Sequence, residues 1–184
     1  MIKSEDTDIS SINEKNNFEN KKNSIKNNNF KFISLLSDIL THICKESKTN
    51  EDEKLNLIKP FIFKKMPHIT IYDYIERLYK YSKVSDEIFI LTLIYIDRIC
   101  FLYKIKLNYF NIHKLFLASF IVAIKYHEDS YYSMKFYAKL CGVPLKEMLH
   151  LEYEFLKLIR FNLFVSEALF NKYKDNILNC ENDY

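Results

Sequence analysis

The chain of 184 residues has a single glycine, three prolines and no tryptophan. A protein built from β-hairpins needs glycine and proline at its tight turns, because those turns require unusual or fixed backbone angles. Loops that cradle phosphate groups also need several glycines close together. The scarcity of glycine therefore excludes a glycine-rich phosphate loop and favours an all-α fold.

Cysteine, charge of one sign and long apolar runs are also scarce. The four cysteines lie far apart, with no CxxC pair and no Cys/His cluster at the spacing of a zinc site. The net charge of +3 is too small and too mixed to indicate a nucleic-acid partner. Apolar runs such as 88–96 and 115–124 are too short to cross a bilayer, which takes about 20 residues. Because the N-terminus shows no secretory signal, we expect a protein of the cytoplasm or nucleus, with reduced cysteines and no membrane partner.

Composition divides the chain into three parts. Residues 1–29 are rich in Asn, Lys, Ser and Glu, and they have too few apolar side chains to offset the loss of chain entropy on folding. We therefore predict a disordered, low-complexity tail over 1–29. Residues 30–60 should form an N-terminal helix and a charged connector, and the prolines in 55–67 favour extended or irregular backbone there. Residues 61–184 should form the main domain with a C-terminal helix.

Capping residues and apolar periodicity predict a series of helices. Thr70 has Asp73 three residues later, in a capping-box position. The only glycine, Gly142, suits the left-handed residue that ends a helix, and Pro144 suits the first position of the next helix. The expected helices are about 30–45, 71–81, 86–103 after Ser85, 112–127 after Asn111, 134–141 after Ser133, 144–159, and a last one after Ser166.

Two of these helices, at 86–103 and 112–127, are apolar on nearly every side. Such helices lie at the centre of a bundle, wrapped by amphipathic ones. The first nevertheless has Asp97 and Arg98 next to each other near its end. Adjacent side chains on a helix point in different directions, so the two charges cannot neutralise each other. Asp97 therefore needs a partner on another element.

An enzyme needs convergent polar groups, and the sequence offers few. His127, Glu128 and Asp129 are consecutive, so their side chains diverge, and a solvated helix end is a better interpretation than a metal site. No cysteine has a histidine at a spacing typical of a protease. We therefore predict a protein that is not an enzyme and uses no cofactor or metal.

Three charged residues are harder to explain by position alone. Lys125 ends an apolar helix, where the helix dipole favours a cation. Asp129 follows just beyond, where the same dipole disfavours an anion, so Asp129 should gain from a basic partner. Glu152 lies on an otherwise apolar face, and partial exposure of a polar edge explains it as well as a functional role does.

Six short motifs follow one another along residues 61–173. They are PHITIYDYIERL at 67–78, YIDR at 95–98, NIHKL at 111–115, AIKY at 123–126, DSYY at 129–132 with YAKLCGV at 137–143, and LEYEFL at 151–156. Each motif alone is weakly specific, and six in register are strong. Together they resemble the cyclin box. The 67–78 and 129–143 motifs resemble its P-type (phosphate-pathway, also called P/U-type) branch.

The resemblance implies a single five-helix cyclin fold with an extra helix at each end. It also implies a regulatory subunit that forms a heterodimer with a cyclin-dependent protein kinase and activates it, in cell division or nutrient signalling. In the family, the residues matching Lys125 and Glu152 pair and hydrogen-bond the backbone beside the regulatory helix of the kinase. Asp129 is expected to contact a kinase arginine. Aromatic support is expected from Phe116, Tyr126, Tyr131 and Tyr132.

One departure from the family concerns Asp97. In many cyclins the matching residue pairs with an arginine of the first helix, and here His68 stands near that place. Asp97 then needs another partner, and His68, Lys64 and Lys65 are the candidates. Arg98 is expected to point to the surface. Asp97→Ala is expected to destabilise the fold, since breaking a buried pair on one side costs roughly 3–5 kcal/mol.

Two other functions stay open. The chain could be a cyclin-fold scaffold that binds a kinase without activating it. It could also be a nucleic-acid binder similar to general transcription factor B, which predicts two cyclin folds and a basic surface.

Overall fold

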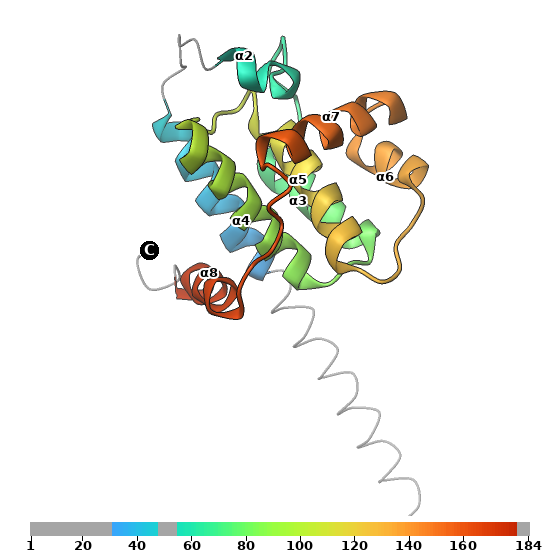
Figure 1. The fold of residues 1–184 in the computed structure, drawn as a ribbon. Helices are drawn as coiled ribbons and strands as arrows, with labels where there is room; N and C mark the ends of the chain where they lie inside the picture. Colours follow the sequence, from blue (N-terminus) through green and yellow to red (C-terminus); the bar gives the residue numbers. More distant parts are fainter. Residues whose placement is uncertain (1–30, 48–54, 180–184) are drawn as a thin grey trace, which may run out of the picture.

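The computed structural model describes residues 31–47 and 55–179. Within these ranges the regular secondary structure is helical throughout, without a strand (Figure 1). A helix over 31–46 comes first, and the later elements are α2 (Leu55–Ile58), the 3-10 helix η1 (Lys59–Phe61), α3 (Ile71–Ser82), α4 (Asp86–Tyr103), α5 (Ile112–His127), α6 (Met134–Cys141), α7 (Leu145–Leu158) and α8 (Glu167–Asn179).

The helices α4 and α5 form the centre of the bundle, as predicted. They pack against each other, α7 packs against α5, and α6 packs against both α3 and α7 (Figure 1). At the contact of the central pair, the fully buried Ser119 donates its hydroxyl hydrogen to the carbonyl oxygen of Thr92 at 2.8 Å. Ala118 and Ala123 of α5 are also buried, and side chains of this size allow neighbouring helices to approach closely. The all-α fold is confirmed.

Local caps start and end the outer helices where the sequence predicts. The Thr70 hydroxyl accepts a hydrogen bond from the Asp73 backbone N–H at 3.0 Å and donates one to the Asp73 carboxylate at 2.7 Å. Ser133 caps α6 by accepting from the backbone N–H of Phe136 at 3.3 Å. Gly142 ends α6 in the left-handed conformation, with φ of 73°. These contacts satisfy backbone groups that a helix end leaves without partners.

Ser85 and Asn111 stand at the predicted N-cap positions, but their side chains bond to other segments. The backbone N–H and the hydroxyl of Ser85 both donate to Oε1 of Glu128, at 3.0 and 2.9 Å. Asn111 accepts from the backbone N–H of Asn108 at 2.9 Å and donates to the carbonyl oxygen of Lys106 at 3.0 Å. Glu128 therefore places a carboxylate at the N-terminus of α4, where the helix dipole favours negative charge.

The prediction of irregular structure over 55–67 is wrong in part, because α2 and η1 lie within it. Pro60 is compatible with the first turn of η1, where a missing N–H leaves no bond unmade. Phe61 is fully buried and its ring is edge-on to Phe155 of α7, with centroids 6.3 Å apart. Burial of that ring holds the short helical turns against the bundle. Pro144 is also displaced from its predicted place, since it is the N-cap residue of α7 rather than its first helical residue.

The helix over 31–46 and α8 are the extra helices expected at each end. Leu36 and Leu40 of the first are buried in the core, and so is Ile177 of α8. α8 packs against α4 on the outside of the bundle (Figure 1). The predicted tail over 1–29 lies outside the described residues. In the part of the chain that the structure describes, no helix combines the length and apolarity needed to cross a bilayer.

Candidate functional site

An ion pair joins the end of α5 to the middle of α7. The Nζ of Lys125 donates to both carboxylate oxygens of Glu152, at 2.6 and 2.8 Å. The two side chains are 31% and 12% exposed, so the pair lies at the surface and is shielded on one side. The last turn of α5 also favours the positive charge of Lys125 through the helix dipole. The structure thus brings together two of the charged residues that were hardest to explain from sequence.

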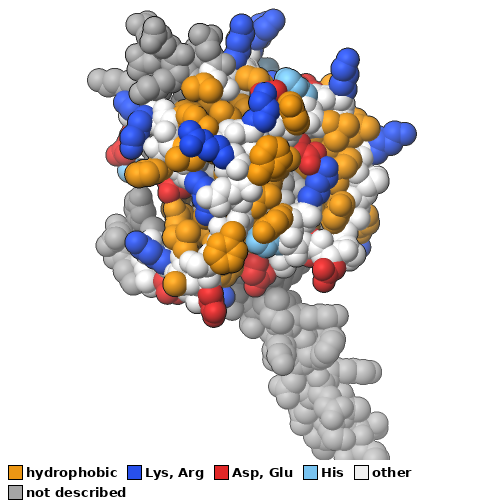
Figure 2. Space-filling view, in the orientation of Figure 1, with side chains coloured by type: hydrophobic (Ala, Val, Ile, Leu, Met, Phe, Trp, Pro, Cys, Tyr) orange, Lys and Arg blue, Asp and Glu red, His pale blue; other side chains and the backbone are white. Residues whose placement is uncertain are grey.

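Large apolar side chains are exposed near this pair. Leu149 and Leu156 precede and follow Glu152 by about one turn of α7, and Leu149 is 44% exposed. Tyr126 of α5 is 53% exposed, and Phe161, just after α7, is 65% exposed. Figure 2 shows hydrophobic side chains spread over the face formed by α7 and the chain that follows it, with lysine and arginine side chains between them. An apolar face of this kind is typical of a protein–protein contact.

The loop between α5 and α6 holds three other predicted site residues. Asp129, Tyr131 and Tyr132 are all exposed. The ring of Tyr132 packs on that of Phe136, with centroids 4.5 Å apart. Among the residues that the structure describes, no ion pair involves Asp129. Its contact with a kinase arginine stays a prediction.

Phe116 does not belong to this surface. It is 1% exposed, and its ring lies 6.4 Å from that of Tyr74, 6.5 Å from that of Phe89 and 6.3 Å from that of Phe120. The predicted contact of Phe116 with a partner protein is therefore wrong for the folded chain. The Phe116 ring fills the space between α3, α4 and α5. This is the usual position of an apolar side chain on a helix that is buried on all sides.

Asp97 differs from its predicted role in both burial and partner. It is exposed, and its Oδ2 accepts a hydrogen bond of 2.5 Å from the hydroxyl of Tyr173 on α8. In the described part of the chain, none of the predicted partners His68, Lys64 and Lys65 makes a hydrogen bond or ion pair with it. The reason is the position of α8, which covers the side of α4 that carries Asp97. The predicted structural pair of Asp97 and His68 is wrong.

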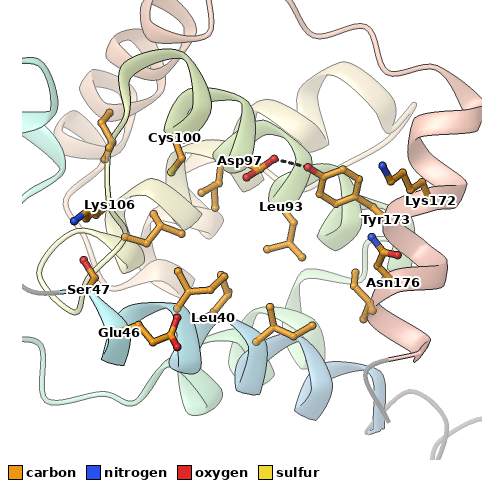
Figure 3. A pocket seen from close by; sticks show the side chains of 16 residues that line it. Leu40, Glu46, Ser47, Leu93, Asp97, Cys100, Lys106, Lys172, Tyr173 and Asn176 are labelled. Carbon is orange, nitrogen blue, oxygen red and sulfur yellow. Dashed lines mark hydrogen bonds between the residues drawn. The ribbon is translucent and has the colours of Figure 1, made fainter. Parts of the chain in front are cut away.

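The Tyr173–Asp97 bond lies in the wall of a cavity of about 720 Å³ between the helix over 31–46, α4 and α8 (Figure 3). Half of the residues that line the cavity are aliphatic, and Leu40 and Leu93 face each other across it. Charged side chains of both signs stand at its edges, and they include Glu46 and Lys106. This mixture selects neither an anionic nor a cationic ligand.

Arg98 is turned toward the chain between α7 and α8. Its guanidinium donates to the backbone carbonyl oxygens of Asn162 and Phe164, the second at 3.1 Å. Tyr103, further along α4, donates to the carbonyl oxygen of Leu158 at 2.9 Å. Arg98 is therefore half-buried and bonded rather than free at the surface. No sequence pattern indicates these contacts, because each joins residues more than fifty positions apart.

Loss of solvation shifts the pKa of three thiols and two histidines in the described part. It raises the pKa of Cys44, Cys100 and Cys141 to about 12, so little thiolate forms at neutral pH. It lowers the pKa of His113 and His127, which are therefore neutral at that pH. The arrangement around Lys125 and Glu152 has the chemistry of a docking surface.

Comparison with known proteins points in the same direction. The family model described as Cyclin matches residues 2–163. The PHO85 cyclin-like protein psl1 of Schizosaccharomyces pombe is 39% identical over 120 residues, which cover 64% of this chain and 49% of that protein. Cyclin-U4-1 of Arabidopsis thaliana is 34% identical over 148 residues, 78% of this chain and 72% of that protein. PHO85 cyclin-7 of Saccharomyces cerevisiae is 34% identical over 149 residues, 74% of this chain and 52% of that protein. The chain spans about half the length of the two yeast relatives.

Proposed function

Because the chain belongs to the cyclin family, and within it to the P/U-type cyclins, we propose that it binds and activates a cyclin-dependent protein kinase. Cyclins are regulatory subunits and not enzymes, so the kinase would supply the ATP and the chemistry. The observation that carries the proposal is the Lys125–Glu152 pair on a partly apolar, exposed face.

The pair suits recognition of a polypeptide backbone. An ammonium group has three donors, and Lys125 uses two of them on Glu152. The third can donate to a carbonyl oxygen of the kinase. The carboxylate of Glu152 keeps lone pairs for backbone N–H groups of the kinase. The pair can therefore bind both kinds of backbone group beside the regulatory helix, as the family resemblance implies.

The apolar side chains near the pair would exclude water when the kinase binds. Tyr126, Leu149 and Phe161 are exposed in the free chain and would be covered in the complex. Contacts that keep water out are needed around the strongest contacts of an interface. Removal of water also strengthens the interactions of the charged pair, because the local dielectric constant falls.

The loop between α5 and α6 would supply a second contact. Asp129 is exposed there and has no basic partner in the described part of the chain, so a kinase arginine near the activation segment can pair with it. Tyr131 and Tyr132 flank that contact with exposed rings and hydroxyls. A charge reversal, Asp129→Lys, should weaken the complex and lower kinase activity. Unchanged binding and activity would remove Asp129 from the interface.

Co-expression with candidate cyclin-dependent kinases, followed by purification and a kinase assay, tests the proposal. The wild-type chain should co-purify with one of them and raise its activity. The double variant Lys125→Ala/Glu152→Ala should not co-purify. The matched control is Glu154→Ala/Lys157→Ala, which removes another ion pair of α7 and should bind normally. Normal binding by the first variant would refute the assignment of the site, and binding without activation would establish a scaffold instead.

A further inference from the structure

Three consecutive backbone carbonyls after α7 are bound by two side chains of α4. Arg98 donates to the carbonyl oxygens of Asn162 and Phe164, and Tyr95 donates its hydroxyl hydrogen to that of Leu163, at 2.7 Å. We call Tyr95 and Arg98 the α4 clamp. A planar guanidinium can bind two acceptors in a fixed geometry, so the clamp fixes the path of the chain and not merely its distance from α4.

Tyr95 has several contacts that fix its position. It is fully buried, and the guanidinium carbon of Arg98 lies 5.8 Å from the centre of the Tyr95 ring. The hydroxyl is also 2.8 Å from Nε2 of His127. Since the hydroxyl hydrogen is used on Leu163, Nε2 of His127 is the donor of this second bond. His127 ends α5, so the clamp connects the segment after α7 to both central helices.

The chain enters the clamp in a strained conformation. Arg160 and Phe161 both have left-handed backbones, with φ of 55° and 54°, which side chains with a Cβ adopt at a cost in free energy. The backbone N–H of Phe161 donates to the carbonyl oxygen of Leu156 at 3.0 Å, which closes the end of α7. Two adjacent residues of this kind persist only when their surroundings hold them, and such strain gathers at functional sites.

The held segment presents two aromatic rings to solvent. Phe161 is 65% and Phe164 is 72% exposed, among the highest values for large apolar side chains of the described residues. The segment is connected to the ion pair through α7. The carbonyl oxygen that accepts from the backbone N–H of Phe161 belongs to Leu156, which is one turn of α7 beyond Glu152.

We propose that Tyr95 and Arg98 are positioning residues, which hold residues 160–164 so that Phe161 and Phe164 dock on the kinase beside the ion pair. This inference rests on the proposed function and adds a regulatory element to it. The α4 clamp does not touch the kinase. It acts through the rings, whose positions in the free chain are fixed before binding, so that less conformational entropy is lost on association.

A double-mutant cycle separates positioning from a general structural role. Arg98→Ala should weaken kinase binding by about tenfold, and so should the variant Phe161→Ala/Phe164→Ala. When the three substitutions are combined, kinase binding should stay about tenfold weaker than that of the wild type. The reason is that rings without a fixed position contribute little to binding. Losses that multiply to about a hundredfold would overturn the inference. Tyr173→Phe, which removes the bond to the neighbouring α4 residue Asp97, is the control and should bind as the wild type does.

Hydrogen exchange in the free chain gives a readout that needs no kinase. In Arg98→Ala the backbone amides of Phe161 and Asn162, which donate to Leu156 and Ile159, should exchange faster, while those of the central helices α4 and α5 keep their protection. Unchanged exchange of these two amides would overturn the inference whatever the kinase does. A chain that binds no cyclin-dependent kinase would overturn both proposals. A chain whose binding depends on the ion pair and the two rings but not on Arg98 would overturn only this one.

Discussion

Replacing Glu152 by glutamine would show whether the ion pair serves binding or stability. The change keeps the size of the side chain and removes its charge. In the free chain the Lys125 side chain is 31% exposed, so water screens the pair. Surface pairs of this kind contribute about 0.2–1 kcal/mol. We therefore expect the free energy of unfolding to fall by no more than about 1 kcal/mol.

The affinity for the kinase should fall much further. In the complex, water would be excluded and Lys125 would lack its countercharge, a loss of about 2–5 kcal/mol for a truncated interface pair. Glutamine keeps a hydrogen-bond acceptor, which favours the lower end of that range. Because 1.4 kcal/mol is a factor of ten, binding should weaken by at least about 30-fold.

Titration calorimetry with the purified kinase and urea denaturation of the free chain measure the two quantities. The control is Glu154→Gln, since Glu154 pairs with Lys157 at 2.9 Å on the same helix but lies about 200° around it from Glu152. Both measurements should stay near wild type in the control. Kinase binding by Glu152→Gln within about threefold of wild type, less than 1 kcal/mol, would refute the reasoning. A stability loss above about 2 kcal/mol would make the pair a structural element.

Three further predictions concern the free chain and are checked by urea denaturation. Tyr173→Phe removes a hydrogen bond to the exposed Asp97 and should cost about 0.5–1.5 kcal/mol. Glu128→Gln removes the negative charge that accepts two bonds from Ser85 at the start of α4, and should cost about 1 kcal/mol. The loss should be smaller when Ser85 is alanine, because only the bond from the backbone N–H then remains. Burial lowers the pKa of His113 below its usual 6.5, so the unfolded chain binds a proton that the folded chain resists. Stability should therefore fall as the pH drops below about 6.5, and fall less in His113→Gln.

The fold could be predicted from sequence because its signals are local. Thr70, Ser133 and Gly142 act on backbone groups within a few residues of themselves. The central position of α4 and α5 follows from their apolar character all round. The Lys125–Glu152 pair was expected through the family resemblance, since twenty-seven residues separate its members and no periodicity connects them.

The contacts of α4 with the last third of the chain could not be predicted. Asp97 meets Tyr173 seventy-six residues later, and Arg98 meets Asn162 sixty-four residues later. Helical periodicity places a side chain on a face, but it does not say which later segment will cover that face. The prediction for Phe116 was wrong for the opposite reason. Its helix is apolar and buried on nearly every side, so the sequence pattern indicates a core position for Phe116 and not a contact with a partner protein.

Two polar residues near the end of α4 have one physical explanation. Tyr95 and Arg98 lie on the part of an apolar helix where the chain returns after α7. Backbone carbonyls in that irregular return cannot bond to one another as they do in a helix, so buried and half-buried ones need donors from elsewhere. Side chains on α4 supply those donors, and α4 is fixed by the core. The proposed docking face is therefore held by a helix of the core, and Arg98→Ala, at a side chain that is not fully buried, should alter binding with little effect on the bundle.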